Sequence, residues 1–131
     1  KTGELIFINA GHESILLFDE NKNYEYIKSD MPPIGIVKYF SETMVKSNTI
    51  NLKDKTFVVY TDGVTEGYLK NGAELGAEGV QDIINKMTDI TPKTIVEGIE
   101  KQLNWGAEKL RDDITCMAIN IKNTELLKKN K

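Results

Sequence analysis

Two acidic segments, each at the end of an apolar run, constrain what this chain can fold into more than any other feature. Asp62–Gly63 follows the run Phe57–Tyr60 after a single Thr, and Asp112–Asp113 directly precedes the run Ile114–Ile119. Carboxylates at the ends of buried strands are unfavourable unless something pairs with them, and a hard cation is the usual partner. The sequence therefore predicts two strands that bring their acidic ends to one metal site.

The composition limits which metal and which partners this chain could bind. Its 131 residues suffice for one domain with a modest core. A single His and a single Cys cannot supply the four nitrogen or sulfur ligands of a structural zinc site. A metal would therefore be held mainly by oxygen, which favours Mg²⁺ or Mn²⁺. The net charge of −3 argues against a nucleic-acid surface, and Arg111, the only Arg, leaves few bidentate clamps for phosphate.

The sequence carries no sign of a membrane segment. No apolar run reaches the roughly 18 residues of a membrane span, and no signal peptide is apparent. Cys116 lies in an apolar run, where a buried and reduced thiol is expected, and this favours the cytoplasm. Anchoring of a longer protein through segments outside residues 1–131 stays open.

Six short segments have the apolar or alternating pattern of β-strands. They are Leu5–Ile8, Ile15–Phe18, Tyr24–Ile27, part of Glu42–Ile50, Thr56–Tyr60 and about Ile114–Ile121. Gly11 lies between the first two, which are expected to form a hairpin. The acidic stretch Asp19–Asn23 resembles a calcium loop, but its sixth position is Tyr24 instead of Gly, so a hairpin turn is expected there.

Two amphipathic helices are predicted between the last two strands. Val80, Ile83, Ile84 and Met87 fall on one helical face, as do Ile95, Val96, Ile99 and Leu103. Thr91–Pro92 has the N-cap residue and the first-turn proline of a helix start, and the second helix is expected to end around Trp105–Gly106. Strands followed by a helix pair and a returning strand predict an α+β fold.

Five motifs in a fixed order relate the chain to a known family. They are Asn9–His12, Pro33–Gly35, Tyr60–Glu66, Leu75–Gly76 and Asp112–Thr115. Over residues 1–122 the chain resembles the C-terminal portion of the metal-dependent PPM-family protein phosphatases, in the bacterial branch typified by SpoIIE and RsbU. Residues 123–131 are interpreted as a polar tail. The resemblance implies part of a PPM-type β-sandwich flanked by an antiparallel helix pair.

The resemblance also implies roles for particular residues. Asp62 and Asp112 match the metal-ligand aspartates of the family, whereas spacing alone favours ordinary polar turns at both places. Gly63 is expected to let the backbone turn beside the ion. Adjacent residues of an extended segment point to opposite faces, so Asp113 is expected to orient the loop and not to bind the same ion.

Three further residues, Gly11, His12 and Glu66, are not expected to bind the metal or to catalyse the reaction. Gly11 and His12 mark the family branch, and His12 is interpreted as a turn residue and not as a general acid. Glu66 is expected to be a solvated or capping carboxylate. No residue of this chain is assigned as a catalytic acid, base or nucleophile.

In the intact family domain, two Mn²⁺ or Mg²⁺ ions share an Asp from an N-terminal Gly-Asp motif. That motif does not occur in residues 1–131. The expected protein is therefore a phosphoserine or phosphothreonine phosphatase acting on an anti-anti-sigma-type regulator, while this chain alone is expected to be silent and to bind metal weakly.

Two further expectations concern association and the alternative function. A non-catalytic regulatory or interaction domain with a phosphatase-like fold is the alternative, from a different class of protein. The apolar runs Leu5–Ile8, Ile15–Phe18 and Phe57–Tyr60 suggest self-association through exposed strand edges.

Overall fold

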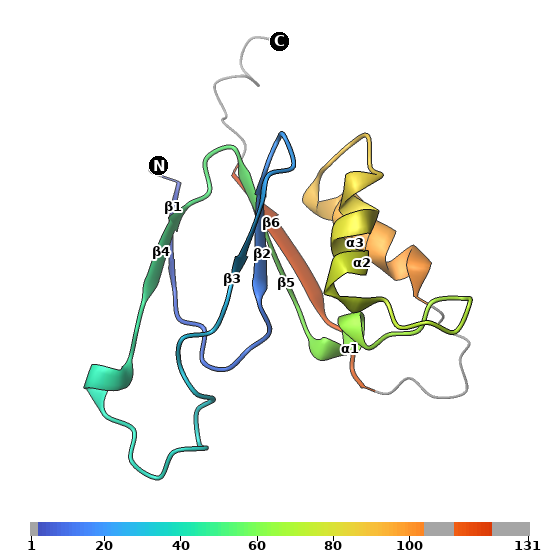
Figure 1. Cartoon of the computed structure of the whole chain (residues 1–131). Coiled ribbons are helices and arrows are strands. Elements are labelled where there is room, and N and C mark those ends of the chain that lie inside the picture. Colours follow the sequence, from blue (N-terminus) through green and yellow to red (C-terminus); the bar gives the residue numbers. More distant parts are fainter. Residues whose placement is uncertain (1–2, 104–111, 122–131) are drawn as a thin grey trace. The chain divides into compact units, whose positions relative to one another are not determined.

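The computed structural model describes residues 3–103 and 112–121, and the chain divides into two compact units (Figure 1). The first unit contains the residues up to Phe57 together with those from Asn120 on, and the second runs from Val58 to Ile119. The described residues form antiparallel strands and a few helices. The α+β class predicted from the sequence is confirmed.

Two antiparallel strand pairs form the first unit. Strand β1 (Glu4–Phe7) pairs with β4 (Asn48–Asn51), and β2 (Ile15–Asp19) pairs with β3 (Tyr24–Ile27). The apolar residues of β2, Ile15 to Phe18, are all buried, so this strand forms the centre of the core. The short 3₁₀ helix η1 (Glu42–Met44) precedes β4. The strand predicted within Glu42–Ile50 is thus confined to its last residues.

The hairpin predicted for the first two apolar segments is wrong, because β1 pairs with β4 and not with β2. The segment between them is held elsewhere. The Gly11 N–H donates to Ser29 Oγ at 2.7 Å, and Ser29 Oγ donates to the Asn9 carbonyl at 2.9 Å. Gly11 has a φ of +76°, and a Cβ there would lie 2.2 Å from Pro33 Cγ. Gly11 therefore serves a close approach to Pro33 instead of a hairpin turn.

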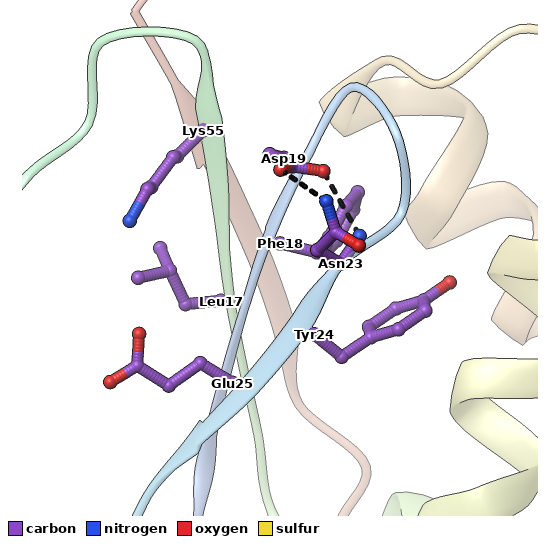
Figure 2. Close-up of a pocket in the computed structure, with 7 residues that line it drawn as sticks. All are labelled: Leu17, Phe18, Asp19, Asn23, Tyr24, Glu25 and Lys55. Carbon is purple, nitrogen blue, oxygen red and sulfur yellow. Dashed lines mark hydrogen bonds between the residues drawn. The ribbon is translucent and has the colours of Figure 1, made fainter.

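Asp19 organises the turn between β2 and β3, which is the hairpin turn predicted from the sequence. Its Oδ1 accepts the N–H of Asn21 at 2.9 Å. From Asn23, Oδ1 accepts the backbone N–H at 2.9 Å and Oδ2 accepts Nδ2 at 2.8 Å (Figure 2). These bonds, first the one from the Asn23 side chain, lower the pKa of Asp19 below its usual value. A groove of about 190 Å³ lies beside the turn and includes Glu25 and Lys55 in its lining.

The second unit places three helices between two strands of the chain. Strand β5 (Lys55–Tyr60) leads from the first unit into it, and β6 (Cys116–Asn120) closes it. Between them lie α1 (Asp62–Thr65), α2 (Gly76–Asn85) and α3 (Pro92–Gln102). The predicted helix faces are confirmed, because their central residues are fully buried: Val80, Ile84, Ile95 and Ile99.

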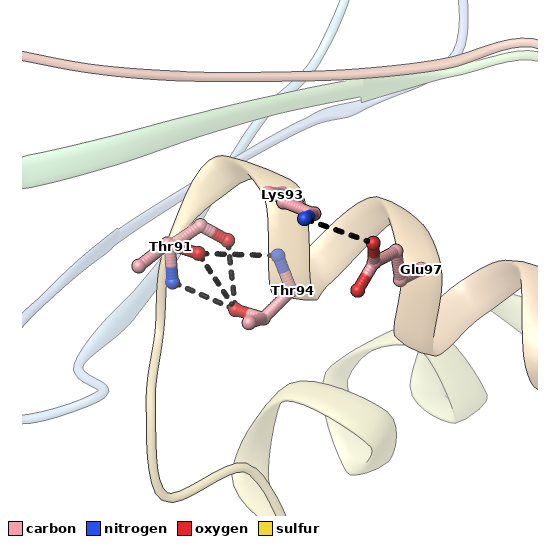
Figure 3. A network of polar contacts seen from close by, with 4 residues as sticks. All are labelled: Thr91, Lys93, Thr94 and Glu97. Carbon is pink, nitrogen blue, oxygen red and sulfur yellow. Dashed lines mark hydrogen bonds and ion pairs between the residues drawn. The ribbon is translucent and has the colours of Figure 1, made fainter.

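The start of α3 follows its sequence signal closely (Figure 3). Thr91 Oγ1 accepts the Thr94 N–H at 3.1 Å, while Thr94 Oγ1 accepts the Thr91 N–H at 2.8 Å. This reciprocal box satisfies two N–H groups that a helix start otherwise leaves unpaired, and such a cap contributes about 1 kcal/mol. The exposed pair Lys93–Glu97, at 3.7 Å, adds little by comparison.

Some predicted boundaries differ or fall outside the described residues. Strand β6 begins at Cys116, two residues later than expected. Thr115 instead forms hydrogen bonds with Thr61, at the junction between β5 and α1. The predicted helix end at Trp105–Gly106, Arg111 and the tail 123–131 lie outside the described residues. Within residues 3–103 and 112–121, no helix has the length and apolar character needed to cross a membrane.

Candidate metal site

Asp62 is placed by the junction between β5 and α1. Tyr60 ends the strand and is buried, Thr61 is the extended N-cap residue, and Asp62 begins the helix with its side chain exposed. One carboxylate oxygen of Asp62, Oδ1, accepts the N–H of Gly63 at 2.9 Å. An acidic residue in the first turn also interacts favourably with the N–H groups of a helix start. The carboxylate is therefore oriented locally and remains accessible.

Three hydrogen bonds join this junction to the segment before β6. The Thr61 N–H donates to the Thr115 carbonyl at 3.0 Å. The Thr61 hydroxyl accepts the Thr115 N–H at 3.0 Å and donates to the Asp113 carbonyl at 3.0 Å. The structure therefore brings Asp62 and the Asp112–Asp113 pair, far apart in sequence, to one place in the second unit.

Gly63 is required by how closely these two segments approach. A Cβ at this position would lie 2.4 Å from the Asp113 carbonyl oxygen and 3.4 Å from that of Asp112. Real side chains do not approach a backbone oxygen at 2.4 Å, so any larger residue would push the segments apart. The sequence points to Gly63 as a turn residue, and the structure supplies this more specific reason.

The residues at this junction match a hard divalent cation in the kind of donor they offer. Asp112 Oδ1 accepts the N–H of Asp113 at 2.7 Å, much as Asp62 Oδ1 accepts that of Gly63. The second carboxylate oxygen of each residue, Oδ2, accepts no hydrogen bond from a residue that the structure describes. Carboxylate oxygen is what Mg²⁺ and Mn²⁺ prefer. No cluster of three or more His, Cys, Asp or Glu suited to a metal occurs within residues 3–103 and 112–121, so these carboxylates supply only part of a shell.

The other predicted residues take simpler places. Asp113 contributes its backbone carbonyl to the bond with Thr61, and its part in orienting the loop stays a prediction. Glu66 is the C-cap of α1, and its N–H donates to the Asp62 carbonyl at 2.8 Å. Gly11 and His12 belong to the first unit, where Asn9 Oδ1 accepts the His12 N–H at 2.9 Å.

The sequence reasoning missed Thr61, which makes all three connections between the segments. This Thr stands between the last strand residue and the acidic residue, a common position that does not mark it as important. Its role was invisible because its partners lie 52 and 54 residues further along the chain. Cys116, by contrast, lies beyond the junction, and burial raises the pKa of its thiol to about 11. A thiol so rarely ionised near neutral pH is a poor nucleophile or metal ligand.

Comparisons with known proteins give a family match for this chain. The family model described as stage II sporulation protein E (SpoIIE) matches residues 1–122. A comparison with curated protein sequences gives no match.

Several solved structures share the fold. The PP2C domain of SiaA from Pseudomonas aeruginosa is 19% identical with a TM-score of 0.66, and the match covers 92% of this chain and 48% of that one. For the RsbU and RsbW domains of a Mycobacterium tuberculosis protein, the identity is 21%, the TM-score 0.65 and the coverage 90% and 33%. For the phosphatase domain of SpoIIE from Bacillus subtilis, these values are 17%, 0.60, and 94% and 57%. At such identities the likeness concerns the fold alone. The chain spans about half the length of the first of these structures and less than two thirds of the length of the other two.

Proposed function

The chain belongs to the SpoIIE family, and on this premise we propose that it forms part of a metal-dependent phosphatase acting on phosphoserine or phosphothreonine in a regulatory protein. The observation that carries the proposal is the junction at Thr61. It joins the segment that bears Asp62 to the segment that bears Asp112 and Asp113. Both carboxylates are exposed, so a cation can reach the oxygen of each that is not engaged with backbone.

In this proposal Asp62 and Asp112 each bind Mg²⁺ or Mn²⁺ through the carboxylate oxygen that is not engaged with backbone. A bound ion of this kind activates water and neutralises charge on a phosphoryl group. Gly63 and the Asp113 carbonyl keep the two segments in contact, and water or further groups complete the shell. Two ions in the intact domain remain part of the proposal, supported by the family.

The substrate and location are proposed on weaker support. The structure that carries RsbU and RsbW domains supports a phosphoprotein of the anti-anti-sigma type as the substrate class. Cys116 is a free thiol, which fits a reducing cytoplasm. The structure of RsbX in complex with magnesium shares the fold, at 15% identity and a TM-score of 0.53, and supports Mg²⁺ as one of the two proposed ions.

Substituting the two carboxylates tests the proposal. Asp62→Asn and Asp112→Asn keep the side-chain shape but remove the charge that binds a hard cation. In the full-length protein, each is expected to reduce Mn²⁺-dependent hydrolysis of a phosphoserine protein by at least about 100-fold, beyond the 10–100-fold typical of lost outer-shell groups. Asp82→Asn, an exposed carboxylate on α2, is the matched control and should retain activity.

Two outcomes would contradict the proposal in different ways. Near-wild-type rates for either site variant at saturating metal would show that the ligands are wrongly assigned. Absence of any metal-dependent hydrolysis by the unsubstituted full-length protein would favour the non-catalytic regulatory domain instead.

A further inference from the structure

The Thr61 side chain makes two hydrogen bonds of opposite sense with the backbone of one distant segment. Its Oγ1 accepts the Thr115 N–H and donates to the Asp113 carbonyl, both at 3.0 Å. A hydroxyl carries one donor and two acceptor lone pairs, so it is the smallest side-chain group that makes both bonds from one atom. Serine preserves this chemistry, whereas valine has the shape of threonine without it.

These bonds connect the residues on either side of the candidate metal site. Thr61 directly precedes Asp62, and Asp113 directly follows Asp112. The Thr61 N–H adds a third bond, to the Thr115 carbonyl, so Thr61 holds the distant segment at two positions, Asp113 and Thr115. Gly63 already lies close to the Asp113 carbonyl, so the two segments cannot move nearer to each other. The separation of the two carboxylates is therefore set by backbone that Thr61 holds.

We propose that Thr61 is a positioning residue for the divalent cation, acting through Asp62 and Asp112 and not as a ligand itself. The proposal rests on the function proposed above. The hydroxyl hydrogen is already committed to Asp113 and one lone pair to the Thr115 N–H. Without the hydroxyl, the 112–115 segment loses two of the three hydrogen bonds that Thr61 makes with it. The carboxylates then spend less time at the spacing that one ion requires.

Titration with Mn²⁺ alone is the experiment that tests this role, and it does not depend on turnover. In the full-length protein, Thr61→Val is expected to weaken Mn²⁺ binding about 10–100-fold, as for other groups that orient metal ligands. Thr61→Ser should stay within about twofold of the unsubstituted protein, because it restores both bonds. Hydrogen exchange at the Thr115 amide should accelerate in Thr61→Val and not in Thr61→Ser.

A matched control separates this role from a general effect on α1. Thr65 also carries a hydroxyl at this helix, but it donates to the Asp62 carbonyl at 3.1 Å and makes no hydrogen bond with residues 112–115, all of which the structure describes. Thr65→Val is therefore expected to bind Mn²⁺ like the unsubstituted protein. Affinities are compared well below each melting temperature, so a loss of stability alone does not change them. If Thr61→Val fails to fold, Thr61→Ala removes the hydroxyl without pressing a methyl against the Asp113 carbonyl and carries the same expectation.

The outcomes distinguish this inference from the proposed function. If Asp62→Asn weakens Mn²⁺ binding while Thr61→Val and Thr61→Ala bind as tightly as the unsubstituted protein, the positioning role is wrong and the metal site stands. If Asp62→Asn itself leaves Mn²⁺ binding unchanged, the proposed function fails. Equal weakening in Thr61→Val and Thr61→Ser would also overturn the inference, because the hydroxyl would then not be the group that matters.

Discussion

At the scale of single residues, the close approach at Gly63 leads to a prediction about stability. Gly63→Ala places a methyl 2.4 Å from the Asp113 carbonyl oxygen, so the two segments must separate. Forced overpacking of this kind is expected to lower the free energy of unfolding by about 1–3 kcal/mol. Denaturant unfolding of the variant measures this change, and Mn²⁺ titration should show weaker binding in the same protein.

Gly35→Ala is the comparison for this prediction. Gly35 has a φ of +96°, but a Cβ there would have nothing within 4 Å. Alanine at this position therefore carries only backbone strain, and metal binding should be unchanged. Unfolding of Gly63→Ala at the same denaturant concentration as the unsubstituted chain would contradict the close-approach argument.

The site residues differ in how far the sequence alone could identify them. Asp62, Gly63 and Asp112 stand beside apolar runs, so their unusual positions are visible in local sequence. Thr61 has no such mark, because a threonine after a strand is common and its partners lie more than 50 residues away in sequence. A residue whose role is a long-range backbone contact cannot be recognised from its neighbours.

At the scale of elements, the β2–β3 turn predicts a pH dependence of stability. The hydrogen bonds to its carboxylate depress the pKa of Asp19 in the folded chain below the usual 3.8. A depressed carboxylate contributes stability that is present above the unfolded pKa and lost as the pH falls through the folded pKa. The contribution of the turn should therefore decline below about pH 3.8, where the unfolded chain takes up the proton more readily than the folded chain.

Thermal melting between pH 7 and pH 3 in the chain and in Asp19→Asn checks this expectation. The variant should be less stable at pH 7, and the difference should shrink as the pH falls below 3.8. Glu20→Gln, at the exposed neighbouring residue, controls for a change in net charge. A difference between Asp19→Asn and the unsubstituted chain that stays constant over this range would rule out a contribution from this carboxylate.

Helices could be predicted from local sequence, whereas the pairing of strands could not. The buried faces of α2 and α3 follow from a spacing of three and four residues, which any local window of sequence contains. The pairing of β1 with β4 joins Glu4 to Asn51, and no turn between adjacent strands announces it. Gly11 predicts a turn, but its N–H is bound by Ser29 and its backbone lies against Pro33, so the turn does not join β1 to β2. Pairing therefore depends on contacts that the sequence does not place side by side.

At the scale of the whole molecule, exposed apolar residues bear on self-association. The runs Ile15–Phe18 and Phe57–Tyr60 are largely buried, so they no longer support the predicted exposed edges. Strand β1 still supports self-association, because it belongs to a two-stranded sheet in the described residues. Ile6 in this strand and Ile8 directly after it are 63% and 52% exposed. An edge strand with exposed branched residues is a template for pairing with another chain. We expect this 131-residue chain to self-associate through β1.

Light scattering over a concentration series measures this association. The average mass should rise with concentration, and Ile6→Lys should reduce the rise, because an edge lysine opposes pairing. Ile36→Lys, at a residue that is 73% exposed and lies outside the described strands, is the matched control and should leave the association unchanged. A constant monomer mass at every concentration would show that β1 recruits no second copy.

The contact between Thr61 and Asp113 also has a consequence for the order in which the protein is made. Its two sides are separated by 52 residues of chain. At roughly 5–20 residues per second, a ribosome adds such a stretch in about 3–10 s. During that interval the nascent chain carries Asp62 without the segment that completes its site. In the proposed site, binding of an ion through both carboxylates must therefore wait until synthesis has passed Asp112, so the order of synthesis sets the earliest point at which the metal could be loaded.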